Sequence, residues 1–229
     1  MKKLFISILT LVLALTMIGC SNKNEKSASS EKKTESIEES SNKSEKNSKV
    51  LVAYFTYGEN VNLPDNVDAS SSASIQVWDN KITGNVGVLA NIISEEIGAD
   101  TFSIKTVEKY SGTYDEVVNQ GQQENVEKAR PNLSTHIENL DEYETIFIGF
   151  PNWWYDMPMA MYSFFDEYDF SGKNIVLFSS SGGSGFSDTV ETIKGLEPDA
   201  NIENEITIGA SDVTNAKNEL KDWLDSIEY

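Results

Sequence analysis

The sequence predicts an α/β fold, a doubly wound five-stranded parallel sheet with the strand order 2-1-3-4-5. Between residues 50 and 229, apolar runs rich in β-branched and aromatic residues alternate with segments of helical periodicity. This alternation is typical of right-handed crossovers that cover both faces of a parallel sheet with helices. The run at 101–104 is shorter and less apolar than those at 50–55 and 144–150, which places it at an edge. The switch point of the sheet then lies between strands 1 and 3.

Each expected element has its own local signal. The strands are the apolar runs at 50–55, 101–104, 144–150, 173–179 and 202–208. The helix at 85–97 places the aliphatic residues between Val88 and Ile93 on one face, and Gly98 ends it. The polar stretch at 56–83 that precedes this helix is long for a connection between a strand and a helix.

Four further helices are expected at 114–130, 158–168, 186–196 and 213–227. The first is polar and stops before Pro131, because proline disrupts a helix interior. The second is rich in Met and aromatic residues, and Pro158 suits its first turn. The last is amphipathic, with Leu220 and Leu224 on its inward face. We see no internal repeat and no second domain, so residues 49–229 form one domain.

The N-terminus has the features of a secretory signal peptide over residues 1–19. Two lysines precede an apolar stretch at 4–18, which is too short to span a bilayer comfortably. Residues 17–20, Met-Ile-Gly-Cys, resemble a bacterial lipobox. This resemblance implies lipidation of Cys20 and a lipid anchor on the extracytoplasmic face of the bacterial cell membrane. Residues 20–48 are Ser, Asn, Lys and Glu with almost no apolar side chain, and are expected to be a disordered tether.

Charge and cysteine content exclude several classes of function. From Val50 onward the chain carries nine Lys and Arg against 31 Asp and Glu, a net charge of −22. A surface this acidic repels nucleic acid and anionic lipid. It favours basic partner proteins, or serves solubility alone. Cys20 is the only cysteine, so the folded part has neither a disulfide nor a cysteine nucleophile. No clustered Cys, His or carboxylate set suggests a metal site.

Three loops are expected to converge at the switch point, where ligands bind in open α/β sheets. The first follows strand 1 and can cradle a phosphate with its backbone N–H groups, helped by the start of the next helix. The second follows strand 3 and carries two tryptophans, which cap the core or pack against a flat ligand. The third is a glycine-rich turn after strand 4, whose glycines allow close backbone approach to a ligand. The candidate cofactor-binding residues are Thr56, Tyr57, Gly58, Glu59, Asn60 and Asn85; Pro151, Asn152, Trp153, Trp154 and Tyr155; and Ser181, Gly182, Gly183, Ser184 and Gly185.

Together these segments resemble the flavodoxin-like family, and residues 153–158, Trp-Trp-Tyr-Asp-Met-Pro, are the most specific part. The resemblance implies an FMN cofactor, with the first loop on its phosphate, the tryptophans beside its ring, and the third loop at the ring's pyrimidine edge. Three departures stand out. More than 20 residues separate the first loop from the helix, so Thr83 and Asn85 compete with Thr56 for the phosphate. Tyr155 replaces a usual Gly, and Ser180-Ser181 replaces a usual Thr-His.

The sequence therefore predicts an FMN-binding electron-transfer protein, with basic redox proteins as partners and no catalytic side chain, since the flavin carries the chemistry. Two alternatives stay open. One is an FMN-dependent NAD(P)H or quinone reductase on the same fold, and the other is a degenerate relative that has lost flavin. His136, the only histidine, is expected at the surface. Asp156 beside the tryptophans is either catalytic or a helix cap.

Overall fold

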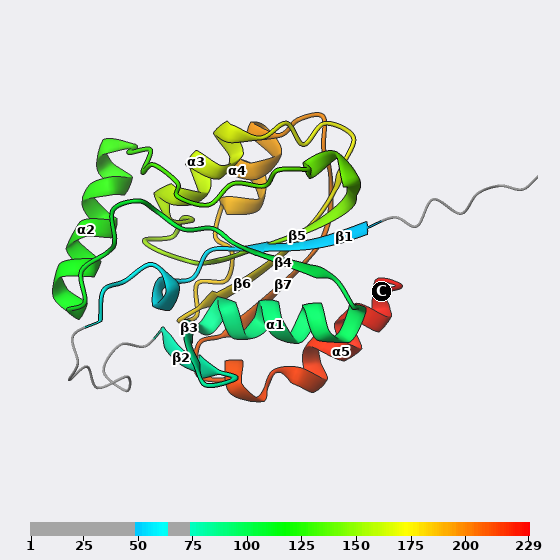
Figure 1. The fold of residues 1–229 in the computed structure, drawn as a ribbon, viewed down its shortest axis with the longest axis horizontal. Coiled ribbons are helices and arrows are strands. Elements are labelled where there is room, and N and C mark those ends of the chain that lie inside the picture. The colour runs from blue at the N-terminus through cyan, green and yellow to red at the C-terminus, as the bar shows by residue number, and fades with distance from the viewer. Residues whose placement is uncertain (1–48, 64–73) are drawn as a thin grey trace, which may run out of the picture. The chain divides into compact units, whose positions relative to one another are not determined.

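The computed structural model describes residues 49–63 and 74–229, and within them five parallel strands form one sheet in the order β4-β1-β5-β6-β7 (Figure 1). The strands are β1 (Lys49–Tyr54), β4 (Asp100–Ser103), β5 (Tyr143–Pro151), β6 (Asn174–Ser181) and β7 (Asn201–Gly209). Counted along the chain, this is the order 2-1-3-4-5, so the predicted fold is confirmed. The predicted signal peptide, Cys20 and tether lie outside the described residues.

Helices cover both faces of the sheet. α1 (Asn85–Ile97) and α5 (Lys217–Ser226) lie on one face, and α3 (Met159–Glu167) and α4 (Thr189–Leu196) lie on the other (Figure 1). Because successive side chains of a strand point to opposite faces of the sheet, each strand contributes to a hydrophobic core on both faces. Val52 and Phe147 join the cluster under α1 and α5, whereas Leu51 and Ile148 join the cluster under α3 and α4. No helix within the described ranges is long and apolar enough to cross a membrane.

The fifth helix, α2 (Tyr114–Glu127), belongs to neither layer. It lies beyond the end of the sheet toward which β1 runs (Figure 1). It ends three residues earlier than predicted, because Lys128 takes the left-handed conformation, with φ of 51°. The backbone N–H of Lys128 then donates to the Asn125 and Glu124 carbonyls, and the N–H of Ala129 donates to the Glu124 carbonyl. α2 therefore covers the end of the sheet where the three loops lie.

The polar stretch at 56–83 is not simply a loop, as the sequence suggested. It opens with a 3-10 turn, η1 (Tyr57–Glu59), and closes with an antiparallel hairpin of β2 (Ile75–Trp78) and β3 (Lys81–Gly84). The two hairpin residues Asp79 and Asn80 both have positive φ, 51° and 60°. This is the geometry of a two-residue hairpin turn, which Asp and Asn tolerate better than most residues.

Three predicted boundaries test local signals. Gly98 ends α1 in the left-handed conformation, as predicted. The strand predicted at 144–150 continues one residue further, since Pro151 is the last residue of β5 and pairs with Ser180. Pro158 precedes α3 as its N-cap instead of lying in the first turn, and Met161 donates its N–H to the Pro158 carbonyl.

Candidate functional site

A cavity of about 390 Å³ opens at the carboxyl ends of β1, β5 and β6, beneath α2. Its wall joins all three predicted loops to the start of α1. The lining residues are Thr56, Tyr57, Ser74, Asn85, Val86, Tyr114, Val117, Val118, Gly121, Pro151, Asn152, Trp153, Trp154, Ser180, Ser181, Gly182 and Ala210. The switch point of the sheet therefore holds a ligand-sized space with an apolar wall and a few polar groups.

The first loop and the start of α1 meet at one end of this cavity in unusually close contact. A Cβ atom on Gly58 would lie 1.8 Å from the Thr83 carbonyl oxygen, and one on Gly84 would lie 2.2 Å from the Thr56 hydroxyl. Gly84 is the N-cap of α1, and no acidic residue occupies the first turn of that helix. Asn85 and Val86, at the positive end of the helix dipole, therefore line the cavity, an arrangement that suits an anion, while the Glu59 carboxylate lies beside the first turn outside the lining.

Trp153 is fixed between the core and the cavity. Its ring packs edge-on against Phe55, Tyr57 and Tyr110, at centroid distances of 5.7, 6.4 and 5.3 Å. A Cβ atom on Gly121 of α2 would lie only 3.2 Å from the same ring, so the glycine lets α2 pack closely against Trp153. Trp153 thus packs against the core and also lines the cavity, so the two roles that the sequence offered for the tryptophans are compatible.

Trp154 is more exposed, at 45%, and its indole N–H donates to the Val118 carbonyl of α2 at 3.1 Å. Trp153 and Asp156 exchange two backbone hydrogen bonds of 2.7 and 3.0 Å around the pair Trp154-Tyr155. Both central residues have positive φ, 55° and 63°. This tight turn therefore carries two large side chains where glycine or asparagine is usual.

Asp156 anchors the tight turn and neither lines the cavity nor caps α3. Its carboxylate accepts from the Met157 N–H at 2.8 Å, from the Asn125 amide of α2 at 3.2 Å, and from the Tyr162 hydroxyl of α3 at 3.1 Å. Burial and then this carboxylate raise the pKa of Tyr162 to about 12, so the hydroxyl stays a proton donor at neutral pH. The turn, α2 and α3 are thereby joined at one acidic group.

The third loop is shaped by the Ser181 hydroxyl, which accepts from the N–H groups of Gly183 and Gly185 at 3.3 and 3.0 Å. The Asn152 amide of the second loop donates to the Gly185 carbonyl at 2.8 Å and so ties the two loops together. Ser180 is 4% exposed and lines the cavity, yet its hydroxyl has no hydrogen-bond partner among the described residues. This hydroxyl is therefore available to a polar group that enters the cavity.

A scan against family models matches residues 74–227 to a flavodoxin model. This match spans more than half of the chain. The chain belongs to the flavodoxin family. No curated protein sequence matches it.

Solved structures with this flavodoxin-family fold include candidate flavoproteins from Bacteroides eggerthii and Bacteroides uniformis. The first is 24% identical with a TM-score of 0.58, and the match covers 80% of this chain and 99% of the relative. The second is 23% identical with a TM-score of 0.58, covering 78% and 98%. A flavoprotein in complex with FMN from Lactobacillus acidophilus is 14% identical with a TM-score of 0.50, covering 73% and 97%. At these identities the likeness supports the fold.

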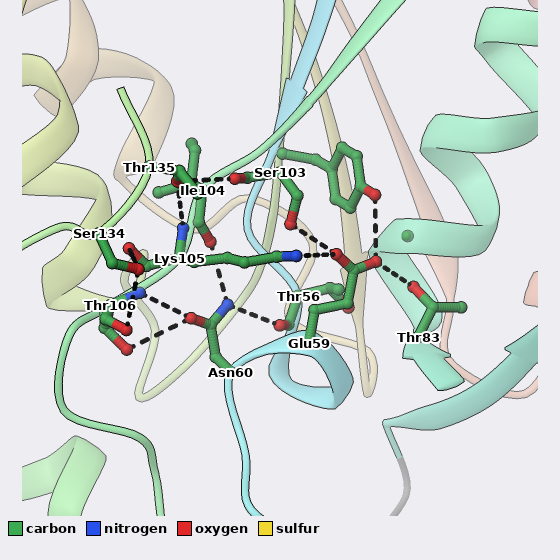
Figure 2. Close-up of polar contacts among 12 residues, drawn as sticks. Thr56, Glu59, Asn60, Thr83, Ser103, Ile104, Lys105, Thr106, Ser134 and Thr135 are labelled. Carbon is green, nitrogen blue, oxygen red and sulfur yellow. Dashed lines mark hydrogen bonds and ion pairs between the residues drawn. The ribbon is translucent and has the colours of Figure 1, made fainter. Parts of the chain in front are cut away.

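The flavodoxin fold brings together nine of the predicted cofactor-binding residues. The cavity is lined by Thr56, Tyr57, Asn85, Pro151, Asn152, Trp153, Trp154, Ser181 and Gly182. It is not lined by Gly58, Glu59, Asn60, Tyr155, Gly183, Ser184 or Gly185. Asn60 is fully buried, and its amide group bonds the Thr56 and Ile104 carbonyls and the Thr106 N–H (Figure 2). The Asn60 side chain therefore braces the loop, and its hydrogen-bonding capacity is already used.

The candidate residues named from the sequence did not include the wall that α2 supplies. That wall is Tyr114, Val117, Val118 and Gly121, and the other lining residues not named were Ser74, Val86, Ser180 and Ala210. A glycine within a polar helix was the one available signal, since such glycines often mark close packing. His136, as predicted, is at the surface, where it pairs with Glu167 at 2.6 Å. Within the two described ranges, no group of three or more His, Cys, Asp or Glu is arranged to hold a metal ion.

Proposed function

We propose that this chain binds FMN in the cavity beneath α2 and acts as an electron carrier on the extracytoplasmic face of the cell membrane. The observation that supports this most is the cavity itself, which joins an anion-suited helix end to an indole-lined wall at the switch point. Family membership points the same way. A bound FMN supplies reversible electron transfer at its ring, and the protein's part is to bind, orient and tune it.

The residues fit such a group. Thr56 and the start of α1 would hold the phosphate, at the end of the cavity where Gly58 and Gly84 let the first loop pack closely against the residues before α1. Trp153 and Trp154 would lie along the ring. The unpartnered hydroxyl of Ser180, with the backbone of Gly182, would meet the polar edge of the ring. The tight turn and the Ser181 bonds hold these groups in place before any ligand binds, which lowers the ordering cost of binding.

The test is a fluorescence titration of FMN into the purified flavin-free chain, beside an absorption spectrum of the chain as isolated. We expect saturable quenching of flavin fluorescence by the wild-type chain and weaker binding by Trp154→Ala. Tyr155→Ala is the matched control, because Tyr155 is the neighbouring exposed aromatic residue and does not line the cavity. A colourless chain that fails to bind added FMN would contradict the proposal and favour a relative without flavin.

Carrier and reductase differ in turnover. The acidic domain and the predicted anchor favour a carrier that meets basic protein partners, because NAD(P)H is absent outside the bacterial cytoplasm. Steady-state oxidation of NAD(P)H by the FMN-loaded chain, with and without a quinone, separates the two. Negligible turnover with rapid electron exchange between the chain and a basic redox protein is expected. Multiple turnovers with NAD(P)H would identify a reductase instead.

A further inference from the structure

The first loop holds a carboxylate, that of Glu59, which is 14% exposed and does not line the cavity. Figure 2 shows this side chain among donors from several segments. One carboxylate oxygen accepts from the Tyr54 hydroxyl at 3.0 Å and from the Thr83 hydroxyl at 2.7 Å. The other accepts from the Ser103 hydroxyl at 2.5 Å, and the Lys105 ammonium lies 3.8 Å away. One partly buried carboxylate therefore has four partners.

These partners connect both halves of one end of the cavity. Glu59 closes η1, which begins with the cavity residue Tyr57. Thr83 directly precedes Gly84, the N-cap of α1, whose first residues Asn85 and Val86 line the same end. The Glu59–Thr83 hydrogen bond thus joins two segments 24 residues apart in the sequence. It does so across the unusually long insertion that separates the first loop from its helix.

Within the part of the chain that the structure describes, no hydrogen bond or ion pair of Glu59 reaches the walls formed by α2, the tight turn or the third loop. Those walls depend on Asp156, Asn152 and Ser181 instead. Loss of the Glu59 contacts should therefore loosen only the end of the cavity next to α1. The region along the indoles keeps its own supports.

We propose that Glu59 is a positioning residue that holds the first loop and the start of α1 in the arrangement that binds the phosphate of FMN. This inference rests on the proposed function. Two effects of the carboxylate oppose each other. Its negative charge repels a nearby phosphate, whereas its hydrogen bonds fix the groups that contact the phosphate. A glutamine would remove the charge, and with only one acceptor oxygen it could not accept from all three hydroxyls. The sign of the change in affinity therefore decides which effect dominates.

The experiment compares FMN with riboflavin, which has the same ring and no phosphate, on the full chain. Glu59→Gln is expected to weaken FMN by about tenfold or more, because a hydrogen bond to a charged acceptor is lost, and to leave riboflavin affinity unchanged. Asp100→Asn is the matched control, since Asp100 accepts a tyrosine hydroxyl at 3.0 Å at the other end of β4. It removes the same charge and should change neither affinity.

Equal losses for FMN and riboflavin would overturn the proposal, because they would indicate a general structural role. Unchanged or tighter FMN binding would also overturn it, because repulsion would then dominate. If Glu59→Gln does not fold, Thr83→Val removes one donor with little change in shape and should lower the FMN-to-riboflavin affinity ratio in the same direction. An unchanged ratio in that variant counts against the proposal.

Failure of the proposed function would look different, because the wild-type chain would bind neither flavin. Amide hydrogen exchange of the flavin-free chain then still decides the positioning role. Faster exchange at Thr56–Gly58 and at Asn85–Val86 in Glu59→Gln, but not in Asp100→Asn, supports it. Equal exchange in all three chains overturns it.

Discussion

The tight turn after β5 makes a prediction about stability that needs no ligand. Tyr155 has φ of 63° and is 74% exposed, and its side chain forms no hydrogen bond, ion pair or ring contact within the described residues. The two hydrogen bonds between Trp153 and Asp156 hold the backbone in the turn whose second central position strongly favours glycine. The tyrosine side chain therefore strains the backbone without a compensating contact.

Tyr155→Gly is expected to stabilise the chain. Left-handed backbone costs a residue with a Cβ roughly 1–2 kcal/mol, and glycine avoids that cost. Glycine also gives the unfolded chain more freedom, which offsets about 0.4–1 kcal/mol. The net gain is about 0.5–1 kcal/mol, or about 1–4 °C in Tm for a domain of this size.

The matched control is Tyr155→Ala, which removes the same ring and keeps the Cβ. Alanine should give no gain, so the difference between the two variants isolates the backbone contribution. Urea and thermal unfolding of the flavin-free chains measure both without any stabilisation from bound ligand. If Tyr155→Gly is no more stable than Tyr155→Ala, the strain assigned to the turn is wrong.

Four further outcomes are expected. Trp153→Ala should lower the free energy of unfolding in urea by about 3–5 kcal/mol, because three edge-on ring contacts are lost. Trp154→Ala should lower it by about 1 kcal/mol, because one hydrogen bond is lost, and equal losses in the two variants would contradict this. Gly58→Ala places a methyl group 1.8 Å from a β3 carbonyl and should weaken FMN in the titration, while Gly195→Ala, with open space around it, should not. Cys20→Ser should move the protein out of the membrane fraction, and an unchanged fraction with unchanged mass would reject lipidation. Electron transfer to a basic acceptor should slow as salt rises from 0.1 to 1 M and the Debye length falls from about 10 to about 3 Å; a flat rate would mean that the acidity serves solubility alone.

Features that depend on a short stretch of chain could be predicted from the sequence. α1 begins and ends where its periodicity and Gly98 indicated, since a helix and its cap are built from neighbouring residues. The order of the sheet followed from apolar content, because an edge strand such as β4 buries less than the central β5. The β2–β3 hairpin escaped prediction because its strands have only four residues each, and Asp-Asn is a weaker turn signal than Asn-Gly.

The roles of individual site residues were decided by contacts between distant segments. Asn60 and Glu59 are the right residue types for a phosphate loop, yet their side chains turn to partners up to 46 residues away along the chain. A polar side chain bonds whichever groups the fold brings near it, and its own sequence neighbours do not reveal them. The same holds for α2, whose polar sequence offered only Gly121 as a signal that it packs over the cavity. Composition and periodicity determined the sheet, its edges and the loops at its switch point, whereas only the packed chain determined which residues of those loops line the cavity.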